Sequence, residues 1–138
     1  MFKLEVGMKI EVSNGEILDK LTILYLKVAF ITDKDKLANV RKEIDALRPI
    51  SQALFQEYGD DLRKFYDELG KINYRLWKVE DQIRECERNK DFSEEFVMLA
   101  RAVYFNNDSR SECKKKINII TNSGIIEEKS YENYETKK

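Results

Sequence analysis

The first twelve residues alternate between apolar and polar side chains. The apolar positions are Phe2, Leu4, Val6, Met8, Ile10 and Val12, with lysine, glutamate or glycine between them. A period of two predicts a half-buried β-strand over residues 1–12; a small hairpin with Gly7 in a type II′ turn is the second possibility. Because a single strand leaves its backbone unpaired, we expect a two-stranded sheet with residues 125–131 or with the same strand of a second subunit.

The period changes to that of a helix at Ser13, where the sequence Ser13-Asn14-Gly15-Glu16 has the form of a capping box. The apolar positions that follow are spaced by three and four; they are Ile17, Leu21, Leu24, Val28 and Ile31, and then Leu37, Val40, Ile44 and Leu47. This predicts two helices within residues 13–59. A turn at residues 32–35 separates them, and Pro49 ends or kinks the second helix.

The most regular pattern lies in residues 60–90. Spacings of three and four alternate there without an error; the apolar positions are Leu62, Phe65, Leu69, Ile72, Leu76, Val79, Ile83 and Cys86. This is a coiled-coil seam on a helix about 45 Å long. Such a helix needs cover along its length, so we expect residues 37–58 to pack antiparallel to it, or a second subunit to do so.

Two shorter helices are predicted in residues 91–124. Asp91 and Glu94 form a possible capping box, residues 106–109 (Asn-Asn-Asp-Ser) form a turn cluster, and Gly124 is a candidate for the residue after the last helix. Residues 125–138 form a C-terminal strand or tail. The predicted fold is a single mainly-α domain, residues 1–138. It is a long antiparallel helical hairpin or bundle with a coiled-coil seam and a minimal N-terminal β-strand or two-stranded sheet.

Composition excludes several classes of function. The 138 residues suffice for one domain with a real core, and 25 basic against 26 acidic residues give a net charge of −1, without attraction to nucleic acid or acidic membranes. Histidine is absent and only two cysteines occur, which excludes histidine-based nucleophile systems and four-thiolate zinc sites. No apolar segment has the length of a membrane span or the form of a signal peptide, so we expect a cytoplasmic protein.

A polar stripe runs beside the seam of the long predicted helix. Its members are Tyr66, Gly70, Asn73, Trp77, Glu80, Arg84 and Glu87. A tryptophan among Asn, Glu and Arg is unusual on a solvated face, because the large ring normally finds cover. The stripe is either a polar cleft with an aromatic floor or a structural face. In the structural interpretation, which we favour, Trp77 packs on a neighbouring helix and Glu80 pairs with Arg84.

A second polar group spans the predicted turn after residue 105. It consists of Arg101, Tyr104, Asn107, Asp108 and Arg110. Arginine and tyrosine beside short amides can hold a carboxylate, a phosphate or sugar hydroxyls. The same residues can also serve as a helix cap with one tertiary salt bridge, and this structural interpretation is the one we favour.

Two further patterns are weak. Acids three residues apart, as in helical magnesium sites, occur at Glu16/Asp19, Glu57/Asp60 and Asp91/Glu94, but chance alone supplies about five such pairs at this acid content. The one basic cluster, Arg110 with Lys114, Lys115 and Lys116, has no interleaved aromatic residue. We therefore expect no metal, no cofactor and no nucleic-acid partner.

The segment from Glu11 to Leu24, EVSNGEILDKLTIL, resembles the opening of a family of small uncharacterised bacterial and phage proteins, a domain of unknown function. Segments that include Leu76-Trp77, Phe96 to Tyr104 and Glu127 to Tyr131 fit the same pattern, in the same order from Met8 to Tyr131. The resemblance implies no activity. Its motif positions fall on Glu16, Asp19, Lys20, Trp77, Glu80, Arg84, Arg101, Tyr104, Asn107, Asp108 and Arg110.

This overlap leads us to expect that the two polar groups, with Asn73, meet as a buried polar network or a ligand site. We expect a non-catalytic helical interaction or scaffold module that forms a homodimer and can contact another protein. The alternative is a small-molecule module, or an enzyme, that takes a sugar or nucleotide in a polar cleft around Trp77, Glu80, Arg84 and Arg101.

Overall fold

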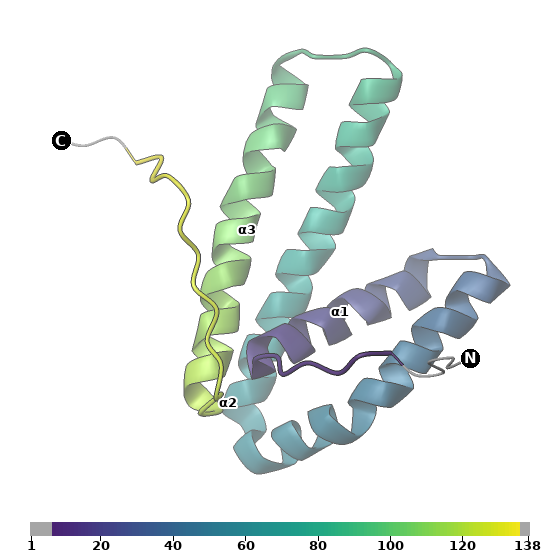
Figure 1. Cartoon of the computed structure of the whole chain (residues 1–138). Helices are drawn as coiled ribbons and strands as arrows, with labels where there is room; N and C mark the ends of the chain where they lie inside the picture. Colours follow the sequence, from purple (N-terminus) through teal and green to yellow (C-terminus); the bar gives the residue numbers. More distant parts are fainter. Residues whose placement is uncertain (1–6, 136–138) are drawn as a thin grey trace, which may run out of the picture.

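The computed structural model describes residues 7–135 and places three helices in them (Figure 1): α1 (Asn14–Phe30), α2 (Lys34–Arg88) and α3 (Glu94–Ile120). Gly59 divides α2 into two pieces, because its φ of 60° and ψ of −137° lie outside the helical region and are favourable only for glycine. The second piece of α2 and α3 form a long antiparallel hairpin. The first piece and α1 form a second hairpin that packs across the lower half of the long one.

Side-chain caps fix where the first two helices begin. The Ser13 hydroxyl accepts a hydrogen bond from the Glu16 amide at 3.0 Å, and Asp33 accepts from the Asp35 and Lys36 amides at 2.9 and 3.0 Å. These bonds satisfy amides that have no partner inside the helix. The predicted helix start at residue 13 is thus confirmed, and a break between the first two helices is present but shorter than the predicted turn at residues 32–35, because α2 begins at Lys34. The Glu16 carboxylate does not complete the capping box; it turns toward α3 instead.

Pro49 neither ends nor breaks its helix. Helical dihedral angles continue through Pro49, and Gly59 is where the chain turns. Proline still leaves one carbonyl without an amide donor, but packing of the buried Val40, Ile44 and Ser51 holds this piece of α2 against the rest of the fold. The predicted boundary between residues 59 and 60 therefore coincides with the turn, although the prediction placed the breaking residue earlier.

The predicted turn at residues 106–109 is wrong, because α3 runs through it as one helix. Asn106 donates from its amide to the Ala102 carbonyl at 2.8 Å, and Ser109 donates to the Phe105 carbonyl at 3.3 Å. These bonds satisfy the polar side chains without ending the helix, and packing along α2 outweighs their preference for turns. Ser93, not Asp91, is the N-cap of α3. Asn122, with a φ of 50°, takes the left-handed position expected for Gly124.

Residues 7–135 contain no β-strand, so the predicted sheet is wrong for this part of the chain. Met8 and Ile10 are 95% and 78% exposed, so the alternating apolar side chains do not face the core. Residues 123–135, named here the tail, run back along α3 and away from residues 7–12 (Figure 1). Residues 125–131, the expected partner strand, therefore lie along α3 and not beside residues 7–12. Residues 1–6 of the predicted strand lie outside the described residues, and pairing with a second subunit stays a prediction.

The predicted seam of the long helix faces the core. Leu62, Leu69 and Ile72 are at most 2% exposed, and they pack with Leu18, Leu21 and Leu24 of α1 and with Cys113 and Ile117 of α3. The antiparallel partner is therefore α3, with α1 across the base, and not residues 37–58 as expected. Figure 1 shows the upper half of the long hairpin as α2 beside α3, with α1 lying at its lower half. No helix within residues 7–135 is long and apolar enough to cross a membrane.

Candidate functional site

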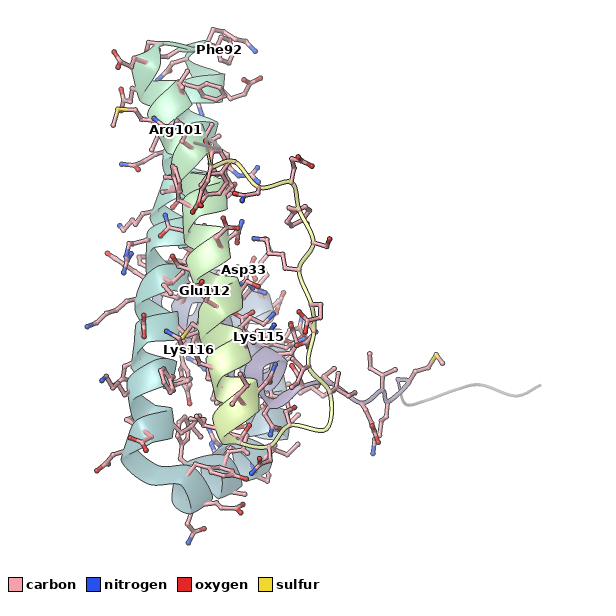
Figure 2. The ribbon with its side chains drawn as sticks, turned by 90° about the vertical axis from the view of Figure 1, so that its left-hand side faces the viewer. Asp33, Phe92, Arg101, Glu112, Lys115 and Lys116 are labelled. Carbon is pink, nitrogen blue, oxygen red and sulfur yellow. The ribbon has the colours of Figure 1, made fainter. Side chains whose placement is uncertain are left out.

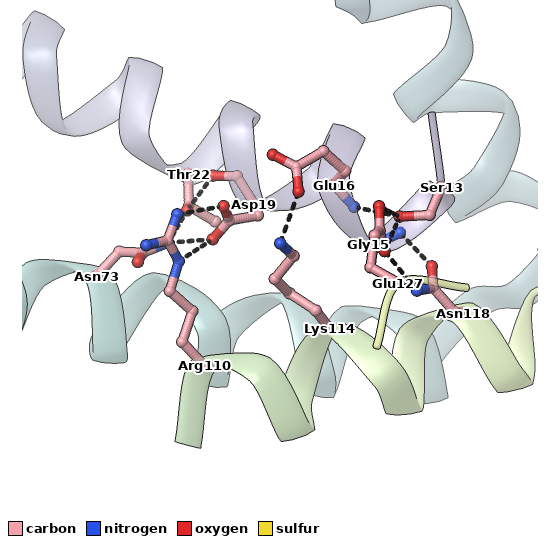
Figure 3. Close-up of polar contacts among 10 residues, drawn as sticks. All are labelled: Ser13, Gly15, Glu16, Asp19, Thr22, Asn73, Arg110, Lys114, Asn118 and Glu127. Atoms are coloured by element: carbon pink, nitrogen blue, oxygen red, sulfur yellow. Dashed lines mark hydrogen bonds and ion pairs between the residues drawn. The ribbon is translucent and has the colours of Figure 1, made fainter. Parts of the chain in front are cut away.

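A buried carboxylate ties the three helices together (Figure 3). Asp19 of α1 has a side chain only 1% exposed, and Arg110 of α3 donates to both of its oxygens, from Nε at 2.8 Å and from Nη2 at 2.5 Å. Asn73 of α2 donates to the same carboxylate at 2.9 Å. A charge buried this deeply is tolerated only when it is paired and hydrogen-bonded, and Asp19 meets both conditions.

The bonds around Asp19 form a satisfied network. Asn73 also donates to the Thr22 hydroxyl at 2.7 Å, and this hydroxyl donates to the Asp19 carbonyl at 2.7 Å. The hydrogen bonds from Arg110 to Asp19 hold the pKa of the guanidinium above its usual range. Within residues 7–135 every buried side-chain nitrogen and oxygen has a partner. A network of this kind sets the register of the three helices.

A second set of contacts binds the start of α1 to the end of α3. Lys114 donates to Glu16 at 2.6 Å, and the Asn118 side chain accepts from the Gly15 amide at 2.6 Å. The helices approach so closely here that a Cβ on Gly15 would lie 2.6 Å from the Lys114 carbonyl oxygen. Glycine is therefore required at position 15 because there is no space for a Cβ atom, and not because of its backbone conformation.

The tail joins this contact through Glu127. The Ser13 hydroxyl lies 2.5 and 2.7 Å from its two carboxylate oxygens, and the Asn118 amide donates to one of them at 3.3 Å. Partial burial alone would raise the pKa of Glu127, but the hydrogen bonds from Ser13 and Asn118, together with the charge of Lys114, outweigh it and the pKa is lowered. The Ser13 hydroxyl thus serves both the helix cap and the tail (Figure 3).

A cleft of about 440 Å³ opens where the three helices meet, and we call it the junction cleft. Ile23 and Leu26 line it from α1, and Asn107 and Arg110 line it from α3. The α2 side chains that line it are Asn73, Leu76, Trp77, Glu80, Asp81 and Arg84. Six of the predicted site residues therefore converge here, and they come from both polar groups.

At the edge of this cleft, residues of the polar stripe also make the contacts that the structural interpretation predicted. The Trp77 ring stacks on Phe30 with 5.5 Å between centroids and 22° between planes. Glu80 and Arg84 approach to 3.7 Å on the surface of α2, where both side chains are more than half exposed. An exposed i,i+4 pair contributes little to stability, so the pair does not explain why these side chains gather there.

The other predicted residues lie outside the junction cleft. Lys20 is exposed, Arg101 lies over the Phe105 ring at 5.6 Å, and Asp108 accepts from Lys129 of the tail at 2.5 Å. This bond from Lys129 lowers the pKa of Asp108. Tyr104 packs on Tyr134 of the tail with 5.6 Å between centroids. The second polar group therefore divides between the cleft, the tail and the solvent.

Comparison with known proteins places the chain in a family. A model described as a family of unknown function (DUF6165) matches residues 8–137, which is nearly the whole chain. The chain belongs to this family. The predicted resemblance, which began at Met8, is thereby confirmed. No curated protein and no solved structure matches this member of the DUF6165 family.

Several residues that build the contacts of this family member had little signal in the sequence. Lys114 belongs to the basic cluster that the sequence marked only as a weak nucleic-acid pattern, yet it binds Glu16. Asn118 belongs to no motif, and Glu127 opens a segment of the family resemblance but was not a candidate site residue. Their roles depend on how α3 and the tail lie against α1, and helical spacing alone does not determine that.

The outward side of α3 forms a separate surface, here named the outer face. Its residues follow helical spacing; they are Glu94, Met98, Arg101, Phe105, Glu112 and Lys116. Met98 is 62% and Phe105 40% exposed. Figure 2 shows Arg101, Glu112 and Lys116 in succession along α3, with the tail beside them. The outer face thus carries Met98 and Phe105 between Glu94, in the first turn of α3, and Lys116, whose ammonium group lies 5.9 Å from the centroid of the Phe65 ring of α2.

Proposed function

We propose that this DUF6165 protein is a non-catalytic helical interaction module that forms a homodimer through the outer face of α3. The observation that carries the proposal is the exposure of Met98 and Phe105 on that face. The internal seam does not require a second subunit, because α3 and α1 cover it. Large apolar side chains that stay exposed along a helix are typical of a surface that another helix covers.

The charges at the two ends of the outer face select a second copy as the partner. Glu94 lies eleven residues before Phe105, and Lys116 lies eleven residues after it. Two antiparallel α3 helices centred on Phe105 would therefore set Glu94 of each copy against Lys116 of the other. Arg101 would come within one helical turn of the second copy's Glu112. A two-fold interface must be self-complementary in this way.

The tail supports this arrangement from one side. Tyr134 packs edge-on against Phe105, with 5.2 Å between ring centroids and 85° between planes. Lys115 binds Glu128 at 3.0 Å and Lys129 binds Asp108 at 2.5 Å, so the tail covers one flank of α3. The aromatic side chain from the tail extends the apolar area at the centre of the proposed interface.

Light scattering coupled to size-exclusion chromatography tests the proposal. At micromolar concentration we expect a mass twice the 16.4 kDa of one chain. Met98→Glu places a charge at the interface and is expected to give the mass of one chain with an unchanged helical spectrum. The matched control is Ile50→Glu, an exposed apolar residue of α2 that is 48% exposed, and it should stay dimeric. Wild-type protein at the mass of one chain would overturn the proposal.

A charge exchange tests the proposed pairing itself. Glu94→Lys and Lys116→Glu should each weaken the dimer by about tenfold, because each sets two like charges against one another. The double variant restores opposite charges and should regain most of the affinity. If the double variant is as weak as the two single losses combined, the two residues do not face each other and the antiparallel arrangement is wrong.

A further inference from the structure

We propose that the junction cleft binds an uncharged saccharide. The cleft holds about 440 Å³, which lies within the range of small-molecule sites, and all three helices contribute to it. Ile23, Leu26 and Leu76 supply apolar surface beside Trp77. The residues that face it from α3, Asn107 and Arg110, lie on the side of the helix opposite the outer face. The site is therefore independent of the proposed dimer.

The aromatic component is a supported indole. Phe30 stacks on one face of Trp77 and holds the ring in place, while Trp77 remains half-buried at the cleft. A flat, fixed aromatic ring suits a sugar ring, whose C–H groups form an apolar face with hydroxyls at its edge. A ligand of this kind needs both an apolar surface and polar partners within a few ångströms.

The polar component can both donate and accept. Glu80 and Asp81 offer acceptors, Arg84 and Arg110 offer donors, and the Asn107 amide offers both. A hydroxyl group also donates and accepts, so a polyol can use all of these partners. The lining carries two acids, Glu80 and Asp81, and two arginines, Arg84 and Arg110, so it has no surplus of positive charge. Arg110 is in addition already paired with Asp19. A phosphate would meet two carboxylates without a surplus of positive charge, which disfavours a nucleotide.

The α3 wall of the site is held in position before any ligand arrives. Asp19 binds Nε and Nη2 of Arg110, which leaves the guanidinium fixed and its other N–H groups to serve further partners. Asn73, at the base of the cleft, is fixed by its bonds to Asp19 and Thr22. A lining that is already ordered loses little conformational entropy on binding.

Trp77 is the only tryptophan of the chain, so its fluorescence reports on this cleft alone. We would titrate the full chain with glucose, galactose, mannose, N-acetylglucosamine and N,N′-diacetylchitobiose, and with inorganic phosphate and ADP for comparison. The expected result is a saturable change in emission with at least one sugar and none with phosphate or ADP. No response to any of the sugars, or a response to phosphate or ADP alone, would overturn the proposal.

Two variants locate the binding. Asn107→Leu keeps the size of the side chain and removes its hydrogen bonds, and Asp81→Ala removes one acceptor; each should raise the dissociation constant at least tenfold. Asp61→Ala, an exposed acid of α2 outside the cleft, is the control and should leave it unchanged. If Asn107→Leu and Asp81→Ala bind the sugar as tightly as the control Asp61→Ala does, the sugar binds outside the junction cleft. The Met98→Glu variant should bind as the wild type does, which separates this proposal from that of the dimer.

Discussion

Asp19 and Gly15 show how single residues of α1 determine the geometry of the whole fold. One is a charge that must meet Arg110, and the other is a position where no side chain fits beside α3. Both stand in the first two turns of α1, where the helix crosses α3. Asp19→Asn removes only the charge and Gly15→Ala adds only a methyl group, so each physical role can be measured separately.

Asp19→Asn should destabilise the protein by about 3 kcal/mol, because it leaves the Arg110 guanidinium beside a neutral amide in a largely dry site. The figure lies at the low end of the range for buried pairs, since the Arg110 side chain is still 29% exposed. Urea unfolding followed by circular dichroism measures it. The control is Asp45→Asn, whose exposed pair with Arg48 should matter by less than about 0.5 kcal/mol. Equal losses in the two variants would contradict the network's role.

Two glycine-to-alanine changes should have opposite signs. Gly15→Ala forces a methyl group against the Lys114 carbonyl and the Asn118 amide, and should cost about 2 kcal/mol. Gly70→Ala meets only a Thr22 methyl group at 3.9 Å, so it should gain up to about 1 kcal/mol from helix propensity. Thermal unfolding compares them directly. A stabilised Gly15→Ala variant would mean that α1 and α3 do not approach as closely as described.

At this scale the sequence indicated which residues matter better than how they pair. Asp19, Asn73 and Arg110 were all candidates, but Asp19 and Arg110 are 91 positions apart and no spacing rule links them. The partners Lys114 and Asn118 carried no specific signal. Pairing across elements depends on the packing angle between helices, which hydrophobic periodicity leaves open.

The long hairpin differs in character along its length. Near its base, α1 adds a third helix to the core, and Cys113 is 2% exposed there. Near its tip α2 packs on α3 without a third helix from residues 7–135, and Val79 and Ile83 stay half-buried. Two-helix contacts bury less apolar surface than three-helix contacts, so the tip should open locally more often than the base.

The two cysteines allow local opening at the tip and at the base of the long hairpin to be compared. Cys86 near the tip should react with a thiol reagent at least about tenfold faster than Cys113, because it is exposed by local opening. Cys113 donates to the Phe65 carbonyl, and burial raises the pKa of its thiol to about 11, so it should stay unreactive at neutral pH until the protein unfolds. Labelling of Cys86→Ala and Cys113→Ala, followed by mass spectrometry, gives the two rates. Equal rates would contradict the described layering.

Element types were predicted well where periodicity was long and poorly where it was short. The seam of residues 60–90 and the capped start of α1 could be predicted because several local signals agree there. The strand prediction failed over residues 7–12 because alternation of side chains does not provide a partner, and the tail that could have paired with it binds α3. The turn at residues 106–109 failed because tertiary packing overrode the local preference of polar residues.

For the whole molecule, the tail connects α1, α3 and the outer face, and its attachment should depend on pH. The pKa of Glu127 in the folded protein is below its ordinary 4.5, so its contribution is present above that pH and is lost as the pH falls through the lower value. Glu127→Gln should therefore be less stable than the wild type at neutral pH, and the difference should vanish in acid. Urea unfolding across the pH range tests this. If the difference in stability between Glu127→Gln and the wild type does not depend on pH, it comes from the shape of the side chain and not from its charge.

The proposed dimer is the central claim at this scale, and its geometry places Phe105 of one copy against Phe105 of the other. The most direct measurement is disulfide cross-linking of Phe105→Cys in a chain whose Cys86 and Cys113 are replaced by alanine. Mild oxidation should link two copies of Phe105→Cys and leave the control Ile50→Cys at the mass of one chain. If Phe105→Cys stays unlinked, or if both variants link equally, the outer face of α3 is not the interface.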